Sequence, residues 1–144
     1  MCLPVFLLLS VFSAVQMSFG SEREVVLLNS PGNSLVSFRF MFHVGSVQDP
    51  SGKEGVAALT AKMLSHGGSS KLTFQELIEF LYPMAAEISS QTDKETTTFI
   101  GRVHRDHLDR FFSVFRNQLL KPRFAVDDFD RNKTELLNYL FYIV

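Results

Sequence analysis

The chain has four histidines, and histidine is the commonest metal-binding side chain in proteins. His104 and His107 are three residues apart at the start of an expected helix, with Asp106 between them, whereas His43 and His66 are isolated. A zinc site needs three or four ligands that converge on one point. We therefore interpret the four histidines as solvated or helix-capping side chains, with a relocated metal site as the alternative.

The first twenty residues form an apolar segment without Lys, Arg, Asp or Glu. Its apolar run, residues 3–15, is shorter than the roughly 20 residues of a membrane span. Ser18 and Gly20 stand where small residues precede a signal-peptide cleavage site, here before Ser21. We predict a signal peptide over 1–20, a mature domain over 21–144, and export to a bacterial periplasm or the medium. An uncleaved anchor or a buried strand is the alternative.

Composition limits the partners and the covalent chemistry. The formal net charge of −1 gives no electrostatic argument for nucleic acid or an anionic membrane as partner, so we expect neither once the signal peptide is cleaved. The single cysteine, Cys2, lies in the predicted signal peptide, which leaves a mature chain without disulfides. A hydrophobic fraction of 46% with 20% charged residues is typical of one folded globular domain.

Hydrophobic periodicity predicts strands and helices that come in pairs. Alternation of apolar and polar residues predicts strands over 34–44, 86–90 and 96–103, and an earlier strand over 24–28. Helical spacing predicts helices over 53–65, over 73–82 behind a Thr73–Glu76 capping box, from Asp106 to the break at Lys121-Pro122, and from Asp127 onward. On the last helix, an apolar set is expected to face the core: Phe129, Leu136, Leu137 and Leu140. The order indicates an α+β fold, a mostly antiparallel sheet packed against paired helices.

Four stretches, in this order, resemble the N-terminal domain of the insulinase/pitrilysin family of metallopeptidases. They are FRFMFHVGSVQDPSGKEG, KMLSHGGSSKLTFQEL, AAEISSQTDKETTTF and FRNQLLKPRFAVDDFDRNKTELLNYL. The first resembles the family's strand and Val-Gly-Ser turn, the second the end of its zinc-bearing helix, the third its next strand pair, and the last a helix, Pro break and helix. The resemblance covers residues 36–140 and implies a partial family domain.

The family's chemistry rests on His-x-x-Glu-His on the first helix, with two zinc ligands and a general base. Aligned from Gly55, those positions are Ala58, Ala61 and Lys62. The third ligand, a glutamate of a later helix in the family, corresponds to Tyr139, and an upstream acidic position to Asn132. The resemblance thus implies a catalytically degenerate member, without the zinc that active relatives bind and without hydrolysis by this mechanism.

Ser89 and Ser90 correspond to the Asn-Ala of the strand whose edge binds extended substrate in the family. A strand edge can pair with a peptide through its main chain, so an extended peptide is one expected partner. An ordinary polar edge strand is the alternative.

We expect a non-catalytic homologue that serves as a scaffold or regulatory partner of an active zinc peptidase of the same family. One alternative is a divergent zinc metalloendopeptidase with a rebuilt site. The other is a non-functional gene fragment, suggested by the end of the sequence at LLNYLFYIV.

Overall fold

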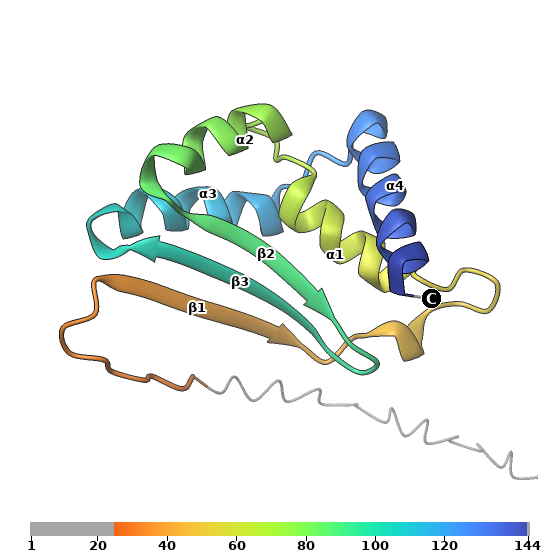
Figure 1. Cartoon of the computed structure of the whole chain (residues 1–144), viewed down its shortest axis with the longest axis horizontal. Coiled ribbons are helices and arrows are strands. Elements are labelled where there is room, and N and C mark those ends of the chain that lie inside the picture. Colours follow the sequence, from red (N-terminus) through yellow and green to blue (C-terminus); the bar gives the residue numbers. More distant parts are fainter. Residues whose placement is uncertain (1–24, 144) are drawn as a thin grey trace, which may run out of the picture. The chain divides into compact units, whose positions relative to one another are not determined.

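The computed structural model describes residues 25–143, so the predicted signal peptide over 1–20 lies outside the described residues (Figure 1). The chain divides into two compact units, the first ending at Pro31 and the second beginning at Gly32. In the first unit, Val25–Leu28 form neither strand nor helix, and their side chains are exposed. The strand predicted over 24–28 is therefore wrong for its described residues, because its backbone finds no ladder partner among the residues that the structure describes.

The second unit contains a three-stranded antiparallel sheet. Its strands are β1 (Leu35–Phe42), β2 (Glu87–Thr92) and β3 (Thr97–His104), in the spatial order β1-β3-β2. The register places Phe38 of β1 opposite Gly101 of β3, and Ser90 of β2 opposite Phe99 of β3. The three strands predicted within this unit are thus confirmed, with β3 at the centre of the described sheet.

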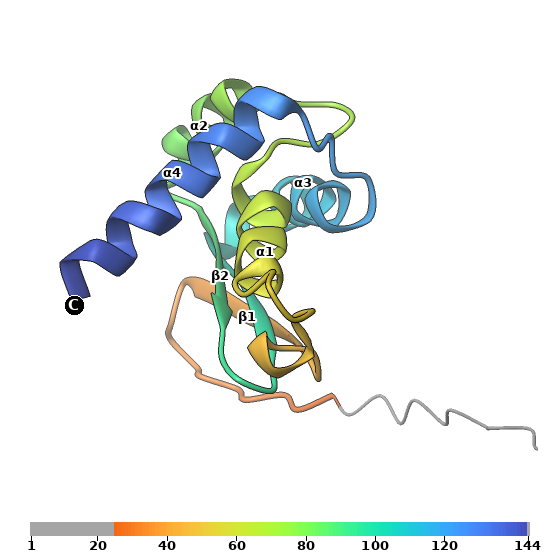
Figure 2. The same cartoon turned by 90° about the vertical axis from the view of Figure 1, so that its right-hand side faces the viewer.

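Four helices gather on one side of the sheet: α1 (Val56–His66), α2 (Phe74–Leu81), α3 (Leu108–Leu120) and α4 (Val126–Ile143) (Figures 1 and 2). Short 3-10 turns occupy Ser46–Gln48, Tyr82–Met84 and Arg105–His107. The predicted α+β architecture, antiparallel sheet against helices, is confirmed. No described helix combines the length and the apolar composition that crossing a membrane requires.

Local signals set the helix starts. Thr73 Oγ1 accepts from Glu76 N at 3.3 Å and a Glu76 carboxylate oxygen accepts from Thr73 N at 2.8 Å, which is the predicted capping box of α2. Asp49 caps α1 from the preceding loop. The helix predicted from Asp106 begins later, at Leu108, because a 3-10 turn precedes α3, and the Asp106 N–H donates to His104 Nδ1 at 3.3 Å.

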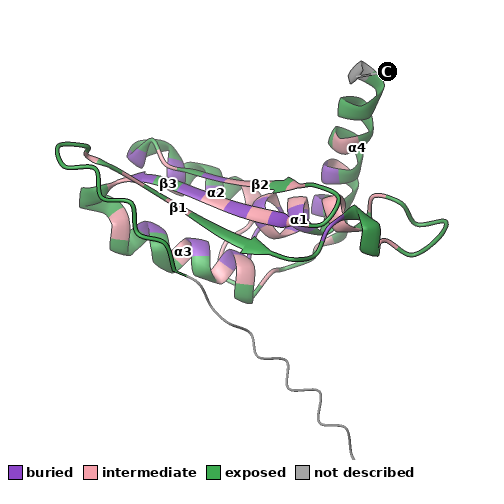
Figure 3. Cartoon of the chain, turned by 90° about the horizontal axis from the view of Figure 1, so that it is seen from below, coloured by how far each residue is buried: buried purple, intermediate pink, exposed green. Residues whose placement is uncertain are grey.

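The core lies between the sheet and the helices, where buried residues follow β3 and the facing sides of the helices (Figure 3). Its largest fully buried members are the rings of Phe111 and Phe115 on α3, with Leu77 of α2 and Val103 of β3. On α4 the expected apolar face is wrong: Phe129, Leu137 and Leu140 are exposed and Leu136 is half-buried. The buried side chains of α4 are polar, Asp128 and Asn132.

Candidate functional site

The first helix carries the three positions at which the sequence suggested degenerate chemistry. Ala58 is half-buried, and Ala61 is buried in the hydrophobic core. Lys62, one residue further, is directed toward α4 instead. The alanine side chain offers no atom that could bind a metal or accept a proton, so Lys62 is the only one of these three positions with an ionisable group.

Lys62 and Glu135 form an ion pair between α1 and α4, with 2.9 Å between Lys62 Nζ and Glu135 Oε2. The hydrogen bond from Lys62 is the main reason that the pKa of Glu135 lies below its ordinary value, and burial opposes this shift only in part. The side chains remain 26% and 50% exposed, so water screens the pair. The pair holds two helices together and leaves the ammonium committed to a carboxylate.

The other two predicted positions on α4 have different surroundings. Asn132 is fully buried, and its side-chain amide donates to Asp128 O at 2.7 Å and lies 3.5 Å from Met63 Sδ of α1. Tyr139 is exposed, one helical turn beyond Glu135. The α1–α4 junction therefore presents an amide, a phenol and an ion pair, and of these groups only the Glu135 carboxylate is a usual zinc ligand.

Arg131 is the central group of the junction, and the sequence analysis missed it. Its Nη1 lies 2.8 Å from Asp128 Oδ1, its Nη2 donates to His66 O at 2.7 Å, and its guanidinium lies 3.8 Å from the centre of the Phe74 ring. Asp128 is buried and its second oxygen lies 3.3 Å from Arg123 Nη2, close enough for an ion pair though not aligned as a hydrogen bond. The available signal in the sequence was Asp128 with Arg131 three residues later on the expected helix and Arg123 shortly before that helix.

A hydroxyl contact connects the junction to the sheet. Ser65 Oγ lies 2.9 Å from Ser90 Oγ and 2.8 Å from His66 Nδ1. Burial, and next the charge of Lys62, lower the pKa of His66 below its ordinary value, which favours the neutral form of this ring. The contact fixes the end of α1 on β2 without placing a charge there.

Ser89 and Ser90 lie on β2, whose only strand neighbour in the described sheet is β3. Ser90 faces the helices, since it contacts Ser65, and strand alternation directs Ser89 to the opposite face. One edge of β2 thus keeps backbone groups without a strand partner among the described residues. This geometry permits pairing with an extended chain.

The structure does not assemble the histidines. His104 and His107 are neighbours, with 6.3 Å between ring centroids, and Asp106 lies 3.3 Å from His104 Nδ1. His66 lies at the far end of a different element, α1, and His43 follows β1. Over residues 25–143, no group of three His, Cys, Asp or Glu side chains comes close enough to hold a metal ion.

Comparison with known proteins gives one family match. The model of the insulinase family (peptidase family M16) matches residues 24–140. No curated protein sequence matches the chain.

Three solved structures share the fold. A protease from Helicobacter pylori has a TM-score of 0.64 at 15% identity, over 74% of this chain and 26% of that one. A peptidase M16 inactive domain from Pseudomonas fluorescens has a TM-score of 0.66 at 24% identity, and the match covers 76% of this chain and 26% of that one. Pitrilysin has a TM-score of 0.68 at 23% identity, and the match covers 77% of this chain and 12% of that one. The chain thus spans about a quarter or less of each matched protein.

Proposed function

The chain belongs to the insulinase family (peptidase family M16), and from that we propose that it is a non-catalytic homologue. In this proposal it acts as a scaffold or regulatory partner of an active zinc peptidase of the family, in an exported compartment. The activity would belong to the partner, and this chain would contribute surface.

The Lys62–Glu135 ion pair carries the proposal. Aligned from Gly55, Lys62 corresponds to the second histidine of the family's motif, and a fixed ammonium at that position would repel a divalent cation. Ala58 and Ala61 supply neither the first ligand nor the general base. One structure with the same fold is itself described as an inactive M16 domain, so a non-catalytic domain of this fold has a precedent.

The free edge of β2 suggests how such a partner could still meet a peptide. Its backbone groups can add an extended chain as a further strand, which needs no metal. We include an extended peptide among the proposed partners for this reason. An ordinary polar edge strand predicts no such binding.

The test is metal analysis and peptidase assay of the purified chain, alone and mixed with an exported family peptidase from the same genome that carries the intact motif. We expect no bound zinc, no hydrolysis by the chain alone, and a changed rate or a co-eluting complex in the mixture. Zinc near one per chain together with hydrolysis would establish the rebuilt-site alternative. A product without ordered secondary structure would favour a non-functional gene fragment.

A further inference from the structure

An apolar groove lies between α1, α3 and the end of β1. Its volume is about 640 Å³, within the range of about 300–1,000 Å³ that binding pockets occupy. Its walls are mainly aromatic and aliphatic, including Phe40 and Phe42 of β1, Phe112 and Leu119 of α3, and Val56 of α1. Phe42 and Val56 are about half exposed, so the groove is accessible from outside.

Three polar side chains of the groove wall are engaged within the protein, whereas Arg116 of α3 is an exposed charged residue of the wall. Thr97 Oγ1 donates to Val44 O at 2.7 Å, and Gln48 Oε1 accepts from Gly45 N at 2.8 Å. The Asp49 carboxylate accepts from two backbone N–H groups at the start of α1. A helix satisfies most of its own backbone polar groups, so it needs fewer hydrogen-bond partners from this mainly apolar wall than an extended peptide does.

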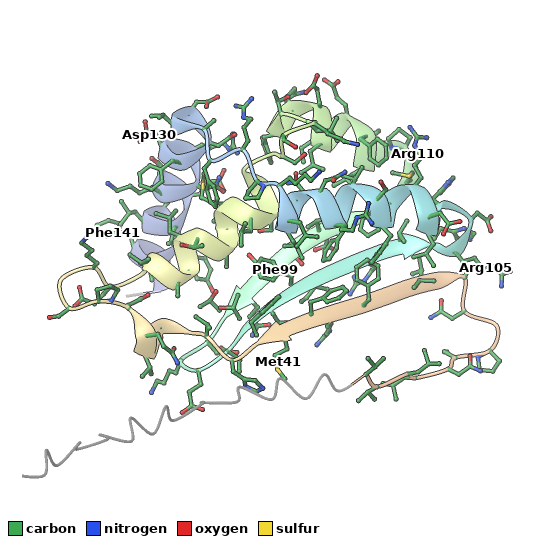
Figure 4. The ribbon with its side chains drawn as sticks, turned by 180° about the vertical axis from the view of Figure 1, so that it is seen from behind. Met41, Phe99, Arg105, Arg110, Asp130 and Phe141 are labelled. Carbon is green, nitrogen blue, oxygen red and sulfur yellow. The ribbon has the colours of Figure 1, made fainter. Side chains whose placement is uncertain are left out.

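The same chain presents an unpacked apolar helix end. After Glu135, α4 carries no charged residue, and its C-terminal half extends away from the other helices (Figure 2). Leu137, Leu140 and Phe141 are 46%, 52% and 82% exposed and lie at i, i+3 and i+4, on one helical face. Phe141 lies on the outer flank of α4, whereas Phe99 lies between the sheet and the helices (Figure 4).

This helix end does not occupy the groove of its own chain. Lys62 and Met63 of α1 contact α4. The groove is lined by Val56, Ala57, Thr60, Ala61 and Leu64 of the same helix, together with α3 and β1. The flank of α1 that contacts α4 is thus different from the flank that lines the groove. We call the apolar end of α4 (Leu137, Leu140 and Phe141) the donor surface and the groove the acceptor surface.

We propose that the C-terminal half of α4 from one copy docks in the apolar groove of a second copy. An uncharged helical segment with a Leu-Leu-Phe face matches an apolar aromatic groove, and its backbone is internally bonded except for the carbonyl groups of its last turn. Donor and acceptor are different surfaces, so two copies can exchange helices reciprocally and close a dimer, or associate head to tail.

The test is the mass of the full chain in solution across a concentration series, by light scattering on a gel-filtration column. The donor variant combines Leu140→Glu with Phe141→Glu. The acceptor variant is Val56→Glu, in which the new carboxylate lies at the start of α1 and suits the helix dipole. The matched control is Tyr82→Glu, at a residue that is 83% exposed and lies in neither surface. We expect association of the wild type and the control, weakened at least about tenfold in the donor and acceptor variants.

Mixing provides the decisive measurement. The donor variant keeps an intact groove and the acceptor variant keeps an intact α4, so an equimolar mixture should form a 1:1 complex that neither variant forms alone. Circular dichroism verifies that both variants are folded. A wild type that is monomeric throughout, association that neither variant weakens, or a mixture without the complex would each overturn the proposal. None of these readouts depends on metal content or peptidase activity.

Discussion

The Phe38 ring of β1 fills the space beside Gly101 of β3, its cross-strand partner, where any other residue would place a Cβ atom. From this position the ring contacts three rings of α3, with centroid distances of 4.9 Å to Phe115 and 5.8 Å to Phe111 and Phe112. The packing of α3 on the sheet thus depends on the absence of a side chain at Gly101 in the central strand.

Gly101→Ala should lower stability by about 1–3 kcal/mol, because the added methyl group overlaps the Phe38 ring and lies close to the Phe111 ring. Urea unfolding monitored by circular dichroism measures the change. In the background of Phe38→Leu, which shortens the side chain beside the glycine, the same substitution should cost less. If Gly101→Ala lowered stability equally in both backgrounds, the overlap with the Phe38 ring would not be the cause.

Breaking the Lys62–Glu135 pair should have a modest effect. Lys62→Met and Glu135→Gln are each expected to lower stability by about 0.5–1 kcal/mol, since both groups are partly exposed. A double-mutant cycle in low salt should give a coupling free energy of similar size, and high salt should reduce it. Zero coupling in low salt would show that the two helices are held together without this pair.

Arg131→Met should destabilise more strongly, by about 2–4 kcal/mol. The substitution removes a hydrogen bond to the His66 carbonyl and leaves the buried Asp128 carboxylate with Arg123 alone. Lys133→Met, an exposed charge on the same helix, is the control and should change stability by less than about 0.5 kcal/mol. Similar losses of stability in both variants would show that the contacts of Arg131 contribute no more than an exposed charge.

Acidification should destabilise the chain partly through His66. Its folded pKa is lowered, mainly by burial and then by Lys62, whereas Glu135 opposes the shift; Arg131 lowers the pKa and Glu87 raises it by smaller amounts. The unfolded state therefore binds the proton first, so stability is complete above the ordinary pKa of 6.5 and declines as the pH falls from there toward the folded pKa. This one group contributes a slope of at most about 1.4 kcal/mol per pH unit. His66→Asn should flatten the dependence of urea midpoint on pH below 6.5, and an unchanged slope would exclude His66 as the cause.

Restoring the family's ligands should restore zinc binding. The variant with Ala58→His, Lys62→His and Tyr139→Glu supplies two imidazoles at i and i+4 of α1 and a carboxylate from α4. We expect one zinc per chain by calorimetric titration, and none in a control with Ala58→His alone. Failure of the folded triple variant to bind zinc would show that Tyr139 is not the position facing α1.

Local interactions made much of the fold predictable. The Thr73–Glu76 box and the alternation around Phe38 involve residues a few positions apart, and both features are present in the structure. Confirmation of the α+β class follows from such short-range patterns. The degenerate positions Ala58, Ala61 and Lys62 could likewise be placed on one helix from their spacing.

Long-range polar contacts were not predictable in the same way. The buried face of α4 is polar because Arg131 bonds the His66 carbonyl and Arg123 approaches Asp128, and neither partner can be read from the periodicity of α4. The apolar set around Leu137 and Leu140 pointed to the wrong face for this reason. The pairing of Lys62 with Glu135 was also invisible, since the two residues lie far apart in the sequence.

The ion pair between α1 and α4 also limits which substitutions of Lys62 the chain can accept without losing stability. A single substitution of Lys62 toward a ligand gives up the pair with Glu135 at once, whereas a metal site appears only when ligands at several positions are present together. An intermediate in which Lys62 alone has changed has therefore lost the pair and has no metal to compensate. Selection for stability alone would preserve Lys62 opposite Glu135.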